Sequence, residues 1–168
     1  MRRRPTELTL RRRQKWTLSL NELLMDPAGI AAFETFANKE LTAENLNFWK
    51  AVQELKQEHI SKQINFEARV NVIYAKYIDA TAADTINIDG PVRERITECV
   101  EEAQPLKAGD KRKSRKKIPL HVYDEAERLI FELMAKNIYP RFISSLNLPP
   151  IETPIAPSRS PSPTNKKK

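Results

Sequence analysis

The spacing of apolar residues along the chain predicts short amphipathic helices and no sheet. Between residues 66 and 77, large apolar side chains recur at steps of three and four, the period of one helix face. The same period runs over 123–134 and 92–100, whereas residues 81–90 lack it and should form a loop. A further short helix is expected around Pro140. Since the chain has only three glycines and few β-branched runs, we predict an all-α fold.

Capping signals predict where three helices in the first third of the chain begin. Residues 19–22 (SLNE) form a capping-box pattern ahead of a short leucine-rich helix. Asp26 is a predicted N-cap, because Pro27 follows it at the first helical position. Thr42 is the predicted N-cap of a helix that extends to about residue 57.

The stretch around this third helix start combines a polar turn with a rigid support. Glu44 falls in the first helical turn, where a carboxylate favours the positive end of the helix. Phe48 and Trp49 follow one turn later, and paired aromatics at this spacing are typical of a buried face. The order therefore presents a fixed polar loop at the entrance of a packed helix.

The net charge of +7 is unevenly distributed along the 168 residues. Basic side chains gather in residues 1–15, 105–117 and 149–168, and the remaining core has 11 basic and 19 acidic residues. Basic tails suit an anionic membrane or nucleic acid, or merely keep a protein soluble. The acidic core argues against nucleic acid and for a basic protein partner. We expect one domain over 16–147, preceded by a flexible basic segment and followed by a disordered Pro/Ser/Lys-rich tail over 148–168.

The chain lacks the motifs of common enzyme classes. It has no Gly-rich phosphate loop, no Gly-x-Ser-x-Gly elbow and no His-Glu-x-x-His pair. Cys99 is the only cysteine, and His59 and His121 have no neighbours at ligand spacing, so we expect no disulfide, metal or cofactor. No apolar run is long enough to span a membrane, and no secretory signal or myristoylation site follows Met1. A binding module without catalytic residues of its own fits these observations better.

Motifs spread over the predicted domain match those of one protein family in order and spacing. Residues 44–49 (ENLNFW) resemble the signature S-x-E-N-φ-x-F-W, and residues 33–36 (FETF) precede it at the expected distance. Residues 86–89 (INID) resemble an hN-L-D segment. The segments 124–126 (DEA) and 139–142 (YPRF) resemble the C-terminal end of the same pattern. The domain is therefore identified as a member of the regulator of G-protein signalling (RGS) family.

The resemblance implies a bundle of about nine short helices that docks on the switch regions of a GTP-bound Gα subunit, of the Gi/o or Gq class. Such a module accelerates GTP hydrolysis without donating an acid, base or arginine, since Gα carries its own arginine and glutamine. It acts by binding the transition-state arrangement better than the GTP ground state. The alternative function is that of an RGS-homology scaffold, which binds signalling partners without accelerating hydrolysis.

Three features most resemble the neuronal RGS subfamily that carries DEP and Gγ-like modules upstream: Trp16 and the segments 26–29 (DPAG) and 51–56 (AVQELK). The chain has no such modules, which is what a short isoform or a fragment of a longer protein would show. A Gβ partner is expected only if an upstream module exists. We expect a cytoplasmic protein that is recruited to the inner face of the plasma membrane.

Carried over position by position, the resemblance assigns two surfaces of the domain to Gα. Asn45 is the central residue of the first, because a short amide both donates and accepts hydrogen bonds, although it would also serve as a local cap. On the second surface, Leu133 equally suits the core, and Arg141 an internal salt bridge. The candidate Gα-binding residues are Glu40, Leu41, Thr42, Glu44, Asn45, Cys99, Leu133, Asn137 and Arg141.

Two of these candidates depart from the family pattern. Counted without gaps from Asn87, Cys99 falls where the family has an asparagine or serine that touches the Gα glutamine, and cysteine is a weak donor and acceptor. We expect Cys99→Asn to raise GTPase activation or leave it unchanged. Asn137 replaces the family's usual aspartate and so removes a charge that would orient Arg141. Both departures reduce the expected strength of activation but not the expected fold.

The basic loop over 105–117 is longer and more positive than the family pattern predicts. It either contacts the anionic inner leaflet, where each basic side chain contributes about 1 kcal/mol, or is a solvated insertion. The candidates for membrane contact are Lys111, Arg112, Lys113, Arg115, Lys116 and Lys117.

Overall fold

The computed structural model describes residues 5–61, 65–105 and 114–148, with side chains from residue 9 onward. Within these ranges every regular element is helical, as predicted for an all-α fold. The elements are α1 (Pro5–Trp16), α2 (Leu20–Leu24), α3 (Pro27–Lys39), α4 (Ala43–Ile60), α5 (Phe66–Ile73), the π-helical turn η1 (Tyr74–Ile78), α6 (Gly90–Glu102), α7 (Asp124–Lys136) and α8 (Ile138–Ser145).

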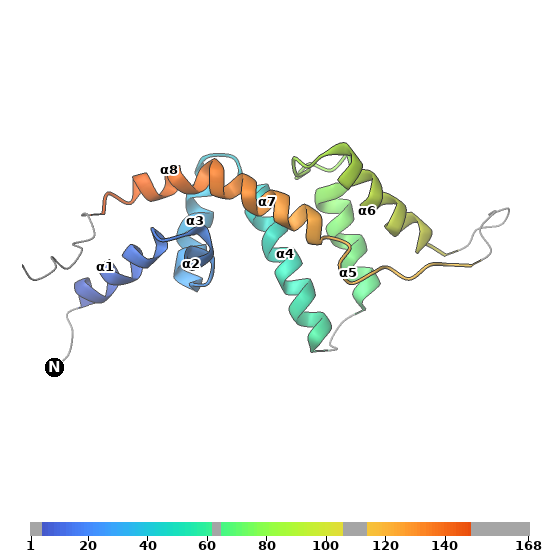
Figure 1. Ribbon diagram of the computed structural model, residues 1–168, viewed down its shortest axis with the longest axis horizontal. Coiled ribbons are helices and arrows are strands. Elements are labelled where there is room, and N and C mark those ends of the chain that lie inside the picture. Colours follow the sequence, from blue (N-terminus) through green and yellow to red (C-terminus); the bar gives the residue numbers. More distant parts are fainter. Residues whose placement is uncertain (1–4, 62–64, 106–113, 149–168) are drawn as a thin grey trace, which may run out of the picture.

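The helices form two groups along the long axis of the molecule (Figure 1). Helices α1, α2, α3 and α8 make up one end and α4 to α7 the other, and α7 leads into α8 across both. At the first end, Phe142 of α8 packs edge-to-face on Phe33 and Phe36 of α3, with ring centroids 5.2 and 5.6 Å apart. At the second, Phe48 packs in the same way on Tyr77 and Tyr123, at 5.8 and 6.0 Å. One cluster of buried side chains runs through both groups, so they share a single core.

Two of the three predicted helix caps are confirmed. The Ser19 hydroxyl accepts from the Glu22 N–H at 3.1 Å, and the Asp26 carboxylate accepts from the Ala28 N–H at 3.0 Å. Thr42 does occupy the N-cap position of α4, but its side chain makes no capping hydrogen bond. The fold therefore begins α3 and α4 in different ways.

The basic segment at the N-terminus is helical over residues 5–15, where the sequence predicted flexibility. Helix α1 is attached to the domain by its arginine side chains. The low apolar content of this segment gives no sign of these contacts. Arg12 forms an ion pair with Asp26, and Arg13 donates to the Leu146 carbonyl at 3.1 Å. The buried Trp16 at the end of α1 donates through its indole Nε1–H to Asp26 at 2.9 Å.

The remaining boundaries follow the predicted pattern with one difference. The apolar face predicted over 66–77 is divided between α5 and η1, because the Asp79 N–H bonds to the Tyr74 carbonyl five residues back rather than four. Residues 79–89 form a loop, as predicted. The Pro/Ser/Lys-rich tail from residue 149 lies outside the described residues, so its predicted disorder stays a prediction.

Candidate functional site

The turn between α3 and α4 holds a leucine in a conformation that normally belongs to glycine. The Leu41 N–H donates to the Asn38 carbonyl at 3.2 Å and the Thr42 N–H to the Ala37 carbonyl at 3.0 Å, which together close a Schellman motif. Leu41 has φ 55°, a left-handed conformation that costs an L-residue about 1–2 kcal/mol. Its side chain is 89% exposed, so no burial offsets this strain. Strain retained in an exposed turn is typical of a functional position.

Two polar atoms at the entrance of α4 are buried without a hydrogen-bond partner. They are the Thr42 hydroxyl oxygen and the Asn45 side-chain carbonyl oxygen. The Asn45 amide NH₂ donates to the Glu44 carboxylate at 2.9 Å, so this side chain does not cap the helix. Buried acceptors without donors destabilise a fold, so both atoms are a local energetic cost at the entrance of α4.

The corner between α7 and α8 contributes the second predicted surface. Leu133 is half-buried and packs against the core, and its carbonyl accepts from the Asn137 N–H at 3.0 Å. Asn137 is exposed at the junction of the two helices. Arg141 is 62% exposed and forms an ion pair with Glu40. This pair brings the two predicted surfaces together, and it gives Arg141 the orienting carboxylate that the asparagine at 137 does not provide.

Cys99 does not lie with these residues. It is on α6 and lines a hollow with Pro119, which precedes α7, and Asp124, the first residue of α7. Asn137 stands at the end of α7, and a helix of 13 residues is about 20 Å long. Cys99 therefore lies along α6, away from the loop that contains Asn87, and its assignment to the Gα-binding site stays a prediction.

The loop before α6 presents Asn87, which belongs to the 86–89 segment and is the residue from which the ungapped count to Cys99 starts. Asn87 is exposed between buried Ile86 and Ile88, and the Ile86 N–H donates to the Tyr77 carbonyl at 3.0 Å. Tyr77 in turn packs on Phe48 of α4. In Figure 1 this loop and the α3–α4 turn reach the same upper edge of the molecule. The alternation of apolar and polar residues at 86–88 was the signal that could have identified it.

The loop that carries Asn87 is held in place by several hydrogen bonds. The Arg93 guanidinium donates to the carbonyls of Ile78 and Ile86, the latter at 2.7 Å, and so joins the two ends of the loop. Inside it, the Asp79 carboxylate accepts from the Thr81 N–H and hydroxyl at 2.8 and 2.7 Å. These bonds lower the pKa of Asp79. The loop is therefore a fixed support rather than a free segment.

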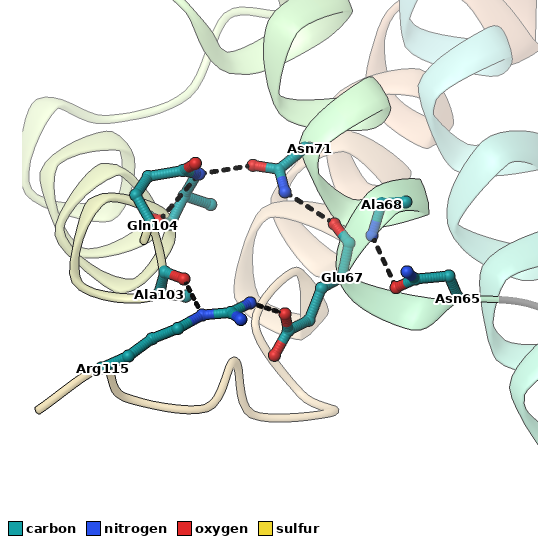
Figure 2. Close-up of polar contacts among 8 residues, drawn as sticks. Asn65, Glu67, Ala68, Asn71, Ala103, Gln104 and Arg115 are labelled. Atoms are coloured by element: carbon teal, nitrogen blue, oxygen red, sulfur yellow. Dashed lines mark hydrogen bonds and ion pairs between the residues drawn. The ribbon is translucent and has the colours of Figure 1, made fainter. Parts of the chain in front are cut away.

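Of the six candidates for membrane contact, two are engaged within the domain. Figure 2 shows Arg115 donating to the Ala103 carbonyl at the end of α6 and forming an ion pair with Glu67 at the start of α5. Lys116 forms an ion pair with Glu102 at 2.7 Å. Lys117 is exposed. The other three candidates, Lys111, Arg112 and Lys113, lie outside the described residues.

The predictions about metals and membrane spans can be compared with the described part of the chain. There, no group of three or more His, Cys, Asp or Glu side chains is placed to hold a metal ion. None of the helices described is both long enough and apolar enough to cross a bilayer.

A sequence model of the "Regulator of G protein signaling domain" matches residues 19–147. This chain belongs to the RGS domain family. It is 34% identical over 143 residues to human regulator of G-protein signaling 21, covering 85% of this chain and 80% of that protein. It is 31% identical over 137 residues to bovine regulator of G-protein signaling 20, covering 82% and 32%. Mouse regulator of G-protein signaling 19 is 31% identical over 132 residues, covering 79% and 53%. The chain thus spans between a third and four-fifths of these relatives.

The RGS relatives correct the predicted subfamily. They are regulators 1, 19, 20 and 21 rather than members of the subfamily with DEP and Gγ-like modules, so the predicted subfamily is wrong. The expectation of a Gβ partner depended on that subfamily and loses its basis. The features behind the subfamily prediction serve packing instead. Trp16 is buried, and a side chain at Gly29 would meet the Leu23 carbonyl oxygen at 2.4 Å. Val52 and Leu55 are buried in α4. Such residues meet the needs of the fold and do not mark a subfamily.

Proposed function

We propose that this RGS domain is a GTPase-activating module for heterotrimeric Gα subunits. The observation that carries the proposal is the position of three segments: the Glu40–Arg141 ion pair joins the α3–α4 turn to the α7–α8 corner, and the loop around Asn87 reaches the same upper edge of the molecule in Figure 1. The turn over 40–45, the loop around Asn87 and the α7–α8 corner with Asn137 and Arg141 all contribute exposed polar groups or unpaired acceptors there. Each is supported by buried aromatic packing, so the edge is rigid.

Such an edge would act by selecting one arrangement of the Gα switch regions. The Gα subunit supplies its own arginine and water-orienting glutamine, so the module needs no acid or base. Contacts that are stronger in the transition state than in the ground state lower the barrier. A hundredfold acceleration requires about 2.7 kcal/mol of such differential binding, which two or three well-placed hydrogen bonds supply.

The test is single-turnover GTP hydrolysis on purified Gα subunits of the Gi/o and Gq classes, with and without the domain. We expect acceleration on at least one class, and a loss of about thirtyfold in Asn45→Ala, equivalent to about 2 kcal/mol. The unfolding free energy of Asn45→Ala should stay within about 1 kcal/mol of wild type, because the carbonyl oxygen has no partner and only the hydrogen bond from the NH₂ group to Glu44 is lost. Binding to Gα without acceleration would favour the scaffold function instead.

A matched pair of variants tests whether Asn87 or Cys99 contributes to GTPase activation. Asn87→Ala should lower the acceleration by about tenfold, the cost of one hydrogen bond to a strained switch. Cys99→Ala should leave it unchanged, since Cys99 faces the beginning of α7. The reverse result would restore the ungapped assignment. A Gα partner of this kind would bring the domain to the inner face of the plasma membrane.

A further inference from the structure

We infer that Glu40 is a positioning residue, which holds the Arg141 guanidinium in the orientation that meets Gα. The inference rests on the proposed function and adds to it a residue that acts through another. Its basis is the ion pair that joins Glu40 of the α3–α4 turn to Arg141 of α8, 101 residues further along the chain.

The backbone around Arg141 is fixed without any help from this ion pair. The next residue, Phe142, is buried and packs edge-to-face on Phe33 and Phe36 of α3. Two residues earlier, the Tyr139 hydroxyl donates to the Trp16 carbonyl at 2.8 Å. Helix α8 therefore stays in place when the pair is broken, and Glu40 determines only where the long arginine side chain points.

The geometry leaves most of the guanidinium open to a partner. Arginine has five N–H donors in a planar fork, and Glu40 engages one terminal nitrogen. Among the residues described, Arg141 has no other recorded hydrogen bond or ion pair, and it is 62% exposed. The remaining donors face solvent as a pre-oriented fork that fits a carboxylate or a pair of backbone carbonyls.

The position of Glu40 in the fold supports its role in orienting Arg141. It is the C-cap residue of α3, where the negative end of the helix dipole disfavours a carboxylate. A residue that breaks this local rule is expected at a functional site, where a gain elsewhere offsets the cost. Asn137, one helical turn before Arg141, is neutral and cannot take over the role. Glu40 is thus the carboxylate that orients Arg141.

The experiment measures two quantities for each variant: the Kd for Gα loaded with GDP and aluminium fluoride, a transition-state analogue, and the single-turnover hydrolysis rate. Glu40→Gln should raise the Kd about fivefold, as expected for an exposed pair. Adding Asn137→Asp should restore it to within about twofold, because a carboxylate four residues before an arginine reaches it on a helical turn. A purely structural clamp between α3 and α8 would not be rescued in this way.

Two further variants serve as controls. Arg141→Ala should raise the Kd at least as much as Glu40→Gln, and combining the two should add nothing further. Glu34→Gln breaks a comparable ion pair on the same helix, with Lys50 at 3.0 Å, and should leave the Kd unchanged.

The inference is overturned if Glu40→Gln leaves the Kd unchanged while Arg141→Ala raises it, or if Asn137→Asp gives no rescue. The assay separates this from failure of the proposed function. A wild-type domain that binds the analogue complex but does not accelerate hydrolysis refutes GTPase activation and leaves the role of Glu40 standing on the Kd values. A wild-type domain that does not bind refutes both.

Discussion

Helices α3 and α4 each have a polar residue at the N-cap position, but only one of these side chains makes a capping hydrogen bond. At the start of α3, the Asp26 carboxylate accepts from the Ala28 N–H and the Trp16 indole N–H and pairs with Arg12. The contacts with Trp16 and Arg12 tie α1 to the start of α3, and the contact with Ala28 caps α3. At the start of α4, the Thr42 hydroxyl is buried and bonds to nothing. The N-cap side chain of α3 is hydrogen-bonded within the fold, whereas the N-cap side chain of α4 has no partner.

The two helix starts differ in how many unfavourable local features they contain. Both starts follow a tight turn between helices, and both have the sequence signal of an N-cap. Only the α4 start adds a left-handed Leu41 and a second unpaired acceptor at Asn45. Local costs that gather in one turn of a domain and are absent from a similar turn indicate a surface that is completed by a partner.

The largest expected difference between the two starts is in stability. Asp26→Ala should lower the unfolding free energy by about 3 kcal/mol, since it removes a cap and leaves the Trp16 indole N–H without its acceptor. Thr42→Ala should change it by less than about 0.5 kcal/mol, because its hydroxyl makes no bond to lose. Urea unfolding followed by circular dichroism measures both. Equal destabilisation by the two substitutions would show that Thr42 caps α4 in solution, and the contrast would disappear.

Helix positions in this domain could be predicted from the sequence because burial follows the helical period. The faces over 66–77, 92–100 and 123–134 all lie in the core, and the caps at Ser19 and Asp26 form as expected. The helix over residues 5–15 could not be predicted in this way. It is held by Arg12 and Arg13, whose partners are distant in sequence or are backbone carbonyls.

The site was predictable only where its residues are close together in the chain. The turn over 40–45 was placed correctly as a polar entrance to α4. The position of Cys99 on α6, apart from the α7–α8 corner, could not be read from the sequence, because counting residues does not show where a loop ends and a helix turns away. The pairing of Glu40 with Arg141 was equally hidden, since no local pattern relates residues 101 positions apart.

A smaller effect, and one of opposite sign, is expected at Leu41. Leu41→Gly should raise the unfolding free energy by about 0.5–1 kcal/mol, because glycine adopts φ 55° without strain and the exposed leucine side chain buries nothing. The same substitution should weaken binding to Gα if the side chain belongs to the site. Urea unfolding and the hydrolysis assay, run on one preparation, report the two effects. A variant that loses stability would mean that Leu41 is not strained, and that the α4 start is ordinary.

The smallest expected effect is a difference in how the stability contributions of the two helix starts depend on pH. The Arg12 guanidinium, with the Trp16 and Ala28 N–H groups, holds the pKa of Asp26 well below its usual range. The unfolded chain takes up a proton near its ordinary pKa of about 3.9, at a pH where folded Asp26 stays ionised. Its contribution to stability is therefore complete above about pH 5 and is lost progressively as the pH falls further.

Asp26→Asn isolates this contribution, since asparagine keeps the cap but cannot titrate. Between about pH 5 and pH 2, the unfolding free energy of wild type should fall more steeply than that of Asp26→Asn, because only the wild type carries this depressed carboxylate. Thr42→Ala should follow the wild-type curve, as a hydroxyl has no charge to lose over this range. Parallel curves for wild type and Asp26→Asn would mean that Asp26 is not held by Arg12 in solution. The α3 start would then be no better satisfied than the α4 start, and an incomplete cap would no longer single out the edge proposed to meet Gα.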